Sequence, residues 1–110
     1  MHITNEGLLT QLGYNCDNAN LSQLQTIATN TPGYDQIKKH IVALNDHLKN
    51  YGGFVAMSNS QPYFKVKIES DDPLAADKAL DELTKWADKY KVTLQKVDNK
   101  RTYYILGINS

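Results

Sequence analysis

Apolar residues recur at helical spacing in some stretches of the chain and alternate with polar residues in others. Recurrence at three and four residues predicts amphipathic helices, and alternation with a period of two predicts half-buried strands. By these patterns we predict helices over residues 4–12, 21–29, 34–50 and 72–90. We predict strands over residues 54–58, 63–69, 92–97 and 102–108. Each long helix is therefore followed by two strands.

The helix predicted over residues 72–90 has the clearest boundaries. Asp72 can accept a hydrogen bond from a free backbone N–H of the first turn, and Pro73 suits the first helical position because that position needs no N–H. Asp81 and Lys85 are spaced for an i, i+4 ion pair on the exposed side. These signals make this helix, with the strands after it, the reference for the rest of the chain.

The segments 34–69 and 72–108 share one order of elements: helix, strand, turn, strand. Either αββ unit alone would leave a hairpin face and a helix stripe exposed, and pairing two units buries both. We therefore predict a single domain over residues 1–110, of the α+β class, in which two αββ units form a four-stranded antiparallel sheet with both long helices on one face. Residues 1–33 form a short helical N-terminal segment that covers an end or an edge. Residue identity between the units is low, so a true duplication stays open.

The apolar stripes of the long helices and of the second strand are long enough to face one another across such a sheet. We expect their members to be buried together: Ile41, Leu44, Phe64, Val66, Leu80, Leu83 and Trp86. The last strand, residues 102–108, is apolar on both faces, so its pattern alone does not fix its register. We take Tyr103, not Tyr104, to point outward.

Composition places the chain among ordinary folded domains, because 41% of its 110 residues are hydrophobic and its 12 basic residues balance 12 acidic ones. A net charge of zero disfavours a nucleic-acid binder that relies on bulk attraction. Cys16 is the only cysteine and has no partner for an intrachain disulfide. Since no apolar run approaches membrane-spanning length and the N-terminus lacks the features of a signal peptide, we expect a cytoplasmic protein that does not enter a membrane.

The residues that most often carry chemistry are poorly placed for it. His40 and His47 lie seven residues apart on one helix, roughly 10 Å along its axis, which is too far to share one metal ion. Cys16 has no basic neighbour in sequence that would lower its pKa. The acidic residues are densest around the start of the last helix, where they complement the helix dipole: Glu69, Asp71, Asp72, Asp77, Asp81 and Glu82. We therefore expect no catalytic residues, no metal and no cofactor, and a protein that is not an enzyme.

The solvent-facing side of the predicted sheet combines basic and aromatic residues. The candidates for binding are Tyr63, Lys65, Lys67, Lys96, Arg101 and Tyr103. This mixture suits protein contact or base stacking. Our first expectation is a small regulatory binding protein, of adaptor or inhibitor type, whose contact is with another protein.

A second interpretation comes from residues 21–68. The order Leu24-x-x-Ile27-Ala28, Pro32-Gly33, Ile37-x-x-His40-Ile41-x-x-Leu44 and then a hairpin resembles in outline a winged-helix DNA-binding domain. The resemblance implies residues 5–12 as the first helix, 34–48 as the recognition helix and 59–62 as the tip of the wing. It would assign DNA contact to Tyr34, Gln36, Lys38 and Lys39. The sequence departs from the pattern in having no Arg among these positions and no basic residue at the wing tip. The identity of the partner, the biological process and the oligomeric state stay open.

Overall fold

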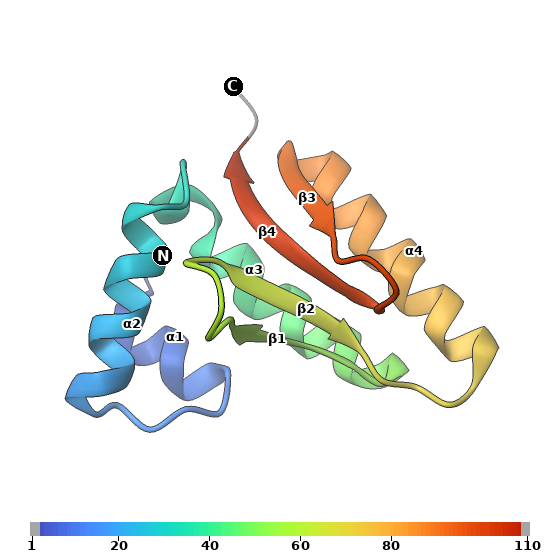
Figure 1. Cartoon of the computed structure of the whole chain (residues 1–110), viewed down its shortest axis with the longest axis horizontal. Coiled ribbons are helices and arrows are strands. Elements are labelled where there is room, and N and C mark those ends of the chain that lie inside the picture. The colour runs from blue at the N-terminus through green and yellow to red at the C-terminus, as the bar shows by residue number, and fades with distance from the viewer. Residues whose placement is uncertain (1–2, 109–110) are drawn as a thin grey trace.

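The computed structural model describes residues 3–108 and forms a four-stranded antiparallel sheet in the order β1-β2-β4-β3 (Figure 1). The helices are α1 (Asn5–Gln11), α2 (Asn18–Thr29), α3 (Tyr34–Leu48) and α4 (Pro73–Tyr90), and a 3-10 turn, η1 (Lys49–Tyr51), follows α3. The strands are β1 (Gly53–Met57), β2 (Phe64–Ile68), β3 (Val92–Lys96) and β4 (Thr102–Ile108). The long helices α3 and α4 lie side by side on one face of the sheet, and α1 and α2 pack together beside the β1–β2 hairpin (Figure 1). The predicted α+β architecture is confirmed.

The core fills the space between the sheet and the two long helices. Phe64, Val66 and Ile68 alternate with half-buried neighbours along β2 and all point toward the helices. They meet the apolar stripe of α3 and the stripe of α4, in which Leu83 is fully buried. Leu80 is a correction, because 38% of it is exposed. It lies at the margin of the α4 face that packs on the sheet. The stripe of apolar residues in the sequence is therefore wider than the face that α4 buries.

Side-chain caps fix where α2 and α4 begin. Asp72 accepts a hydrogen bond from the Leu74 N–H at 3.1 Å, with Pro73 in the first turn, as the sequence predicts. Asp17 does the same for Asn20 at 2.8 Å. This second cap lies inside a polar run, and it starts α2 at Asn18, three residues before the start predicted from apolar spacing.

A close backbone contact joins the end of β4 to the loop between α2 and α3. The Ile108 N–H donates to the Pro32 carbonyl oxygen at 2.8 Å. Gly107 has a φ of 113°, and a Cβ at this position would lie 2.7 Å from the same oxygen. Only glycine fits here without strain. The contact ties the last strand to the N-terminal segment.

The strand pairing decides which side of β4 faces the helices. Tyr103 pairs with the buried Val66, and Tyr104 pairs with Lys65 on the opposite side. Directly paired residues point to the same face of a sheet. Tyr103 therefore packs half-buried against the core and Tyr104 lies on the open face, which reverses the register that we took from the sequence.

The two outer strands of the sheet differ in how the outward backbone N–H groups of their free edges are hydrogen-bonded. On β1 the outward N–H of Val55 donates to Asn45 Oδ1 at 2.9 Å, and the outward N–H of Met57 donates to the Tyr14 hydroxyl at 2.9 Å. Asn45 comes from α3 and Tyr14 from the loop after α1. No hydrogen bond from within residues 3–108 satisfies the outward N–H groups of β3 in this way.

Candidate functional site

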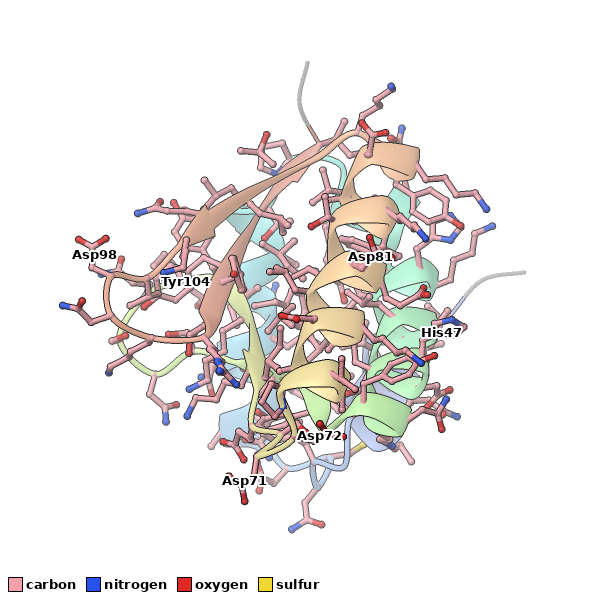
Figure 2. The ribbon with its side chains drawn as sticks, turned by 90° about the vertical axis from the view of Figure 1, so that its right-hand side faces the viewer. His47, Asp71, Asp72, Asp81, Asp98 and Tyr104 are labelled. Atoms are coloured by element: carbon pink, nitrogen blue, oxygen red, sulfur yellow. The ribbon has the colours of Figure 1, made fainter. Side chains whose placement is uncertain are left out.

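The face of the sheet away from α3 and α4 is open and carries the candidate site. Register places Phe54 beside Lys67 and Ala56 beside Lys65 across the β1–β2 pair. The β2–β4 pair adds Tyr104 beside Lys65 on the same face. Figure 2 shows Tyr104 on the sheet side of the molecule and His47 on the helix side. The alternation along β2 that buries three apolar residues is what exposes the two lysines.

A shallow hollow of about 470 Å³ lies in this face. It is bounded by the end of β2, the β1–β2 loop and the β3–β4 turn. Its polar and charged lining residues are Ser58, Ser60, Lys65, Lys67, Glu69, Lys100, Arg101, Thr102 and Tyr104. Four of these carry a positive charge and only Glu69 carries a negative one. Because the whole chain has a net charge of zero, this excess makes the hollow a local basic surface.

Tyr104 is the aromatic residue at the centre of this face. Its hydroxyl lies 3.3 Å from Ser60 Oγ, and its ring centroid lies 6.0 Å from that of Tyr63. Hydrogen bonding to Ser60 lowers the pKa of Tyr104, and the charges of Lys65 and Lys100 act in the same direction. The environment around this ring therefore favours negative charge.

The basic residues keep most of their charge available. Lys67 Nζ is 4.0 Å from Glu69, at the limit of an ion pair, and Arg101 Nη1 donates to the Ser70 carbonyl oxygen at 3.3 Å. Ser70 contributes no charge, so the Arg101 guanidinium is oriented without being neutralised. This geometry suits an acidic ligand, because carboxylates and phosphates are the groups that such donors bind best.

The structure brings together four of the six predicted binding residues: Tyr63, Lys65, Lys67 and Arg101. Lys96 and Tyr103 are paired with each other on the face that α4 covers, so they do not belong to this surface. Sequence reasoning missed Tyr104 as an outward residue and missed Ser58 and Ser60 in the loop. The alternation along β2 predicts that Lys65 points outward, but it does not predict which residue of β4 lies beside Lys65. Only the pairing register of the two strands decides that.

The residues that the winged-helix resemblance assigns to DNA contact are scattered around the start of α3. Tyr34 is only 7% exposed, and its hydroxyl donates to Asn5 Oδ1 at 2.9 Å. Burial, and then the charge of Asp35, raises the pKa of Tyr34 to about 12. Lys38 Nζ lies 3.4 Å from Asp35 and 5.7 Å from the Tyr34 ring centroid. Gln36 and Lys39 are exposed.

A separate groove between α3 and α4 contains both helical histidines. The His40 ring stacks on Tyr90 with centroids 3.8 Å apart, and Trp86 Nε1 donates to the His40 carbonyl oxygen at 3.0 Å. Burial lowers the pKa of His40, and the charges of Lys39 and Lys89 add to this effect. His47 Nε2 lies 3.4 Å from Glu82. These contacts join the two helices: His40 is a packing residue, and exposed His47 pairs with Glu82 at the surface.

Within residues 3–108, the side chains that could bind a metal ion do not gather into one cluster. Among residues 3–108, no group of three or more His, Cys, Asp and Glu side chains is placed to hold a metal ion. Cys16 is exposed, and its thiol donates to the Glu6 carbonyl oxygen at 3.3 Å. In the same part of the chain, none of the helices is long and apolar enough to cross a membrane.

Comparison of the chain with protein-family models, with curated proteins and with solved structures finds no significant match. The function is therefore inferred from the geometry of the basic hollow and of the open face around it.

Proposed function

We propose that this protein is a small non-catalytic regulatory protein that binds an acidic segment of another protein across the open face of its sheet. The observation that carries the proposal is the basic hollow beside Tyr104, lined by Lys65, Lys67, Lys100 and Arg101. Binding there requires no folding of the protein around its ligand, because the strands already hold these side chains on one face.

Charge and aromatic area together support a protein ligand. Acidic side chains of the ligand would pair with the lysines and Arg101, and apolar or aromatic ones would pack on Tyr63 and Tyr104. We keep the cytoplasm as the proposed location because Cys16 is a free thiol.

The winged-helix alternative has less support. Its helix α3 buries Tyr34 and ties Lys38 to Asp35, and DNA contact at α3 would rest on Gln36 and Lys39. The alternative predicts that a charge change on α3, not on the sheet, alters binding to duplex DNA.

Two double variants with the same change in net charge separate the interpretations. Lys65→Glu with Lys67→Glu reverses charge in the hollow, and Lys38→Glu with Lys39→Glu reverses the same amount on α3. The probes are a fluorescein-labelled oligoglutamate containing tyrosine, and a labelled mixed-sequence duplex DNA, each measured by anisotropy across a salt series.

We expect the acidic peptide to bind the unaltered protein, and the sheet variant to bind it at least about tenfold more weakly than the α3 variant does. Equal losses in the two variants would refute the sheet face as the site. Duplex DNA binding with a steep salt slope, lost only in the α3 variant, would replace the proposal by its alternative.

A further inference from the structure

The hydroxyl groups that line the basic hollow form a short hydrogen-bonded chain with one direction. Ser58 Oγ accepts the backbone N–H groups of Ser60 and Gln61, each at 3.3 Å. Both of its lone pairs are then occupied, so its own O–H donates to Ser60 Oγ at 3.2 Å. The Ser60 hydroxyl donates in turn to the Tyr104 hydroxyl at 3.3 Å. The O–H of Tyr104 is therefore the donor that this chain presents to a ligand.

Two cationic side chains act on the same hydroxyl. Lys65 is paired with Tyr104 across β2 and β4, and Lys100 comes from the β3–β4 turn at the border of the hollow. Hydrogen bonds from Ser60 and Ser58 lower the pKa of Tyr104, and the charges of Lys65 and Lys100 lower it further. The donors around this hydroxyl therefore converge from three elements: β2, the β1–β2 loop and the β3–β4 turn.

The charge of the hollow exceeds what one carboxylate would neutralise. Four positive side chains and one negative side chain line it, which leaves an excess of three positive charges. A phosphate monoester carries about −1.5 to −2 charge at pH 7 and has three acceptor oxygens. A carboxylate has one charge and two oxygens that lie in one plane with its carbon. Donors that converge from three elements on an excess of positive charge therefore suit a phosphate better than a carboxylate.

We propose that the acidic segment bound at this face carries a phosphoserine or phosphothreonine, whose phosphate binds between Lys65 and Lys100 and accepts the O–H of Tyr104. This inference rests on the proposed function and names the chemistry of its ligand. Because the hollow is shallow, a short phosphorylated side chain reaches it while the backbone of the segment stays on the sheet face. Lys67 and Arg101 then bind an acidic side chain of the same segment. Lys65 and Lys67 are about 7 Å apart along β2, so an extended segment with its acidic residue two positions from the phosphorylated one reaches both ends.

The borders of the hollow favour a peptide with one phosphate over a nucleic acid strand. Exposed acidic residues lie beyond both ends of the basic surface: Asp71 and Asp72 follow β2, and Asp98 lies at the tip of the β3–β4 turn (Figure 2). A nucleic acid strand has a phosphate at every nucleotide and needs a basic track along its length. These acidic borders limit the basic surface to a single phosphate and its neighbouring carboxylate.

Fluorescence anisotropy at pH 7.5 with three labelled peptides tests the inference. Each peptide is the tyrosine-containing oligoglutamate already described, with its central position as phosphoserine, Glu or Ser. Lys100→Gln and Tyr104→Phe alter the expected phosphate position, and Lys67→Gln makes the same change of charge at the other end of the hollow. Lys78→Gln, at an exposed position on α4, is the control outside the hollow. Far-UV circular dichroism verifies that each variant is folded.

We expect the unaltered protein to bind the phosphoserine peptide about tenfold more tightly than the Glu peptide, and the Ser peptide most weakly. Lys100→Gln and Tyr104→Phe should each reduce this preference to about threefold or less. Lys67→Gln should weaken the phosphoserine and Glu peptides by similar factors and keep the preference, because it removes a charge away from the phosphate. Lys78→Gln should change neither affinity.

The same peptides at pH 5.5 show whether the doubly charged phosphate is the species that binds. With a second pKa of about 6, about three quarters of the phosphate is singly charged at this pH, so the preference should shrink by about threefold. An unchanged preference overturns the inference. The charged and titratable side chains around the hollow are of types that titrate below about pH 5 or above about pH 9 in peptides: Lys65, Lys67, Glu69, Asp98, Lys100, Arg101 and Tyr104.

The other outcomes separate this inference from the proposed function. If the phosphoserine and Glu peptides bind equally and Lys67→Gln weakens both, the inference is overturned and the proposed function stands. If none of the three peptides binds, both are overturned. A preference reduced equally by Lys67→Gln and Lys100→Gln overturns the position given to the phosphate. A labelled single-stranded oligouridylate that binds more tightly than the phosphoserine peptide assigns the hollow to nucleic acid and overturns the inference.

Discussion

The two αββ units share one topology but finish their outer strands in different ways. In the first unit, the side chains of Asn45 and Tyr14 accept hydrogen bonds from the outward N–H groups of β1. In the second unit, none of the residues from 3 to 108 does the same for β3, and α4 lies along this edge with Leu80 part exposed. The comparison shows that one edge is closed from within the chain and that the other is left available.

The difference also gives the N-terminal segment a role. Tyr14 closes β1, Asn5 holds the hydroxyl of Tyr34, and Pro32 holds the end of β4. A strand edge with unpaired N–H groups is a site of unwanted association, and chains commonly cover such edges. Through Tyr14, the N-terminal residues that the structure describes, 3–33, act in this way for the first unit.

The largest expected effect tests whether α3 and α4 contribute equally to the shared core, although the two sheet edges differ. Leu83→Ala in α4 and Leu48→Ala in α3 each remove a fully buried side chain, and each should lower the free energy of unfolding by about 2 to 5 kcal/mol. Leu80→Ala on the exposed flank is the control and should lower it by much less. Urea denaturation measures all three. A Leu83→Ala loss no larger than that of Leu80→Ala would show that α4 does not pack as described.

The next effect concerns Tyr34, which fastens the first unit to α1. Its pKa is raised to about 12, so the neutral form is favoured in the folded state. This contribution to stability is fully present below pH 10, the ordinary tyrosine value, and is lost as pH rises toward 12. A pKa of about 12 in the folded state, against the ordinary value of 10, corresponds to roughly 2 to 3 kcal/mol of stability. We expect the gap in stability between the native chain and Tyr34→Phe to shrink from pH 9 to pH 12. A constant gap in urea denaturation at these pH values would contradict the burial of this hydroxyl.

A smaller effect tests the closed edge directly. Asn45→Leu keeps the branched shape of a buried side chain but removes the acceptor for the Val55 N–H, which should cost about 1 to 3 kcal/mol. Asn50→Leu is the matched exposed control, expected within about 0.5 kcal/mol of the unaltered protein. If thermal denaturation shows equal changes for the two variants, Asn45 does not close the edge.

The sequence predicts the elements well because their apolar periods are local. The sequence does not predict the features that depend on contacts between residues far apart in the chain. The register of β4 depends on pairing with Lys65 and on a bulge at Thr93 and Leu94, neither of which is visible in a strand apolar on both faces. Tyr14 lies 43 residues before Met57, whose N–H donates to the Tyr14 hydroxyl.

The candidate site follows the same division. Lys65 and Lys67 are predictable from the alternation along β2, whereas Tyr103 was assigned to the wrong face because β4 was placed in the wrong register. Lys96 was also assigned to the wrong face, although it lies two residues after Leu94 and therefore on the same side of β3. Leu80 was assigned to the core because a stripe of apolar residues does not show how much of it another element covers.

The most direct test of the central claim, that one sheet edge is closed and the other open, is amide hydrogen exchange followed by nuclear magnetic resonance in dilute protein. The four reporters are the N–H groups of Val55 and Met57 on β1 and of Leu94 and Lys96 on β3. The last two point away from β4, because the Val97 N–H donates to β4 and successive N–H groups of a strand point to alternate sides. We predict slow exchange at the β1 pair, because side chains hold these N–H groups, and fast exchange at the β3 pair. Equal protection of the four amides at low micromolar concentration would contradict the account.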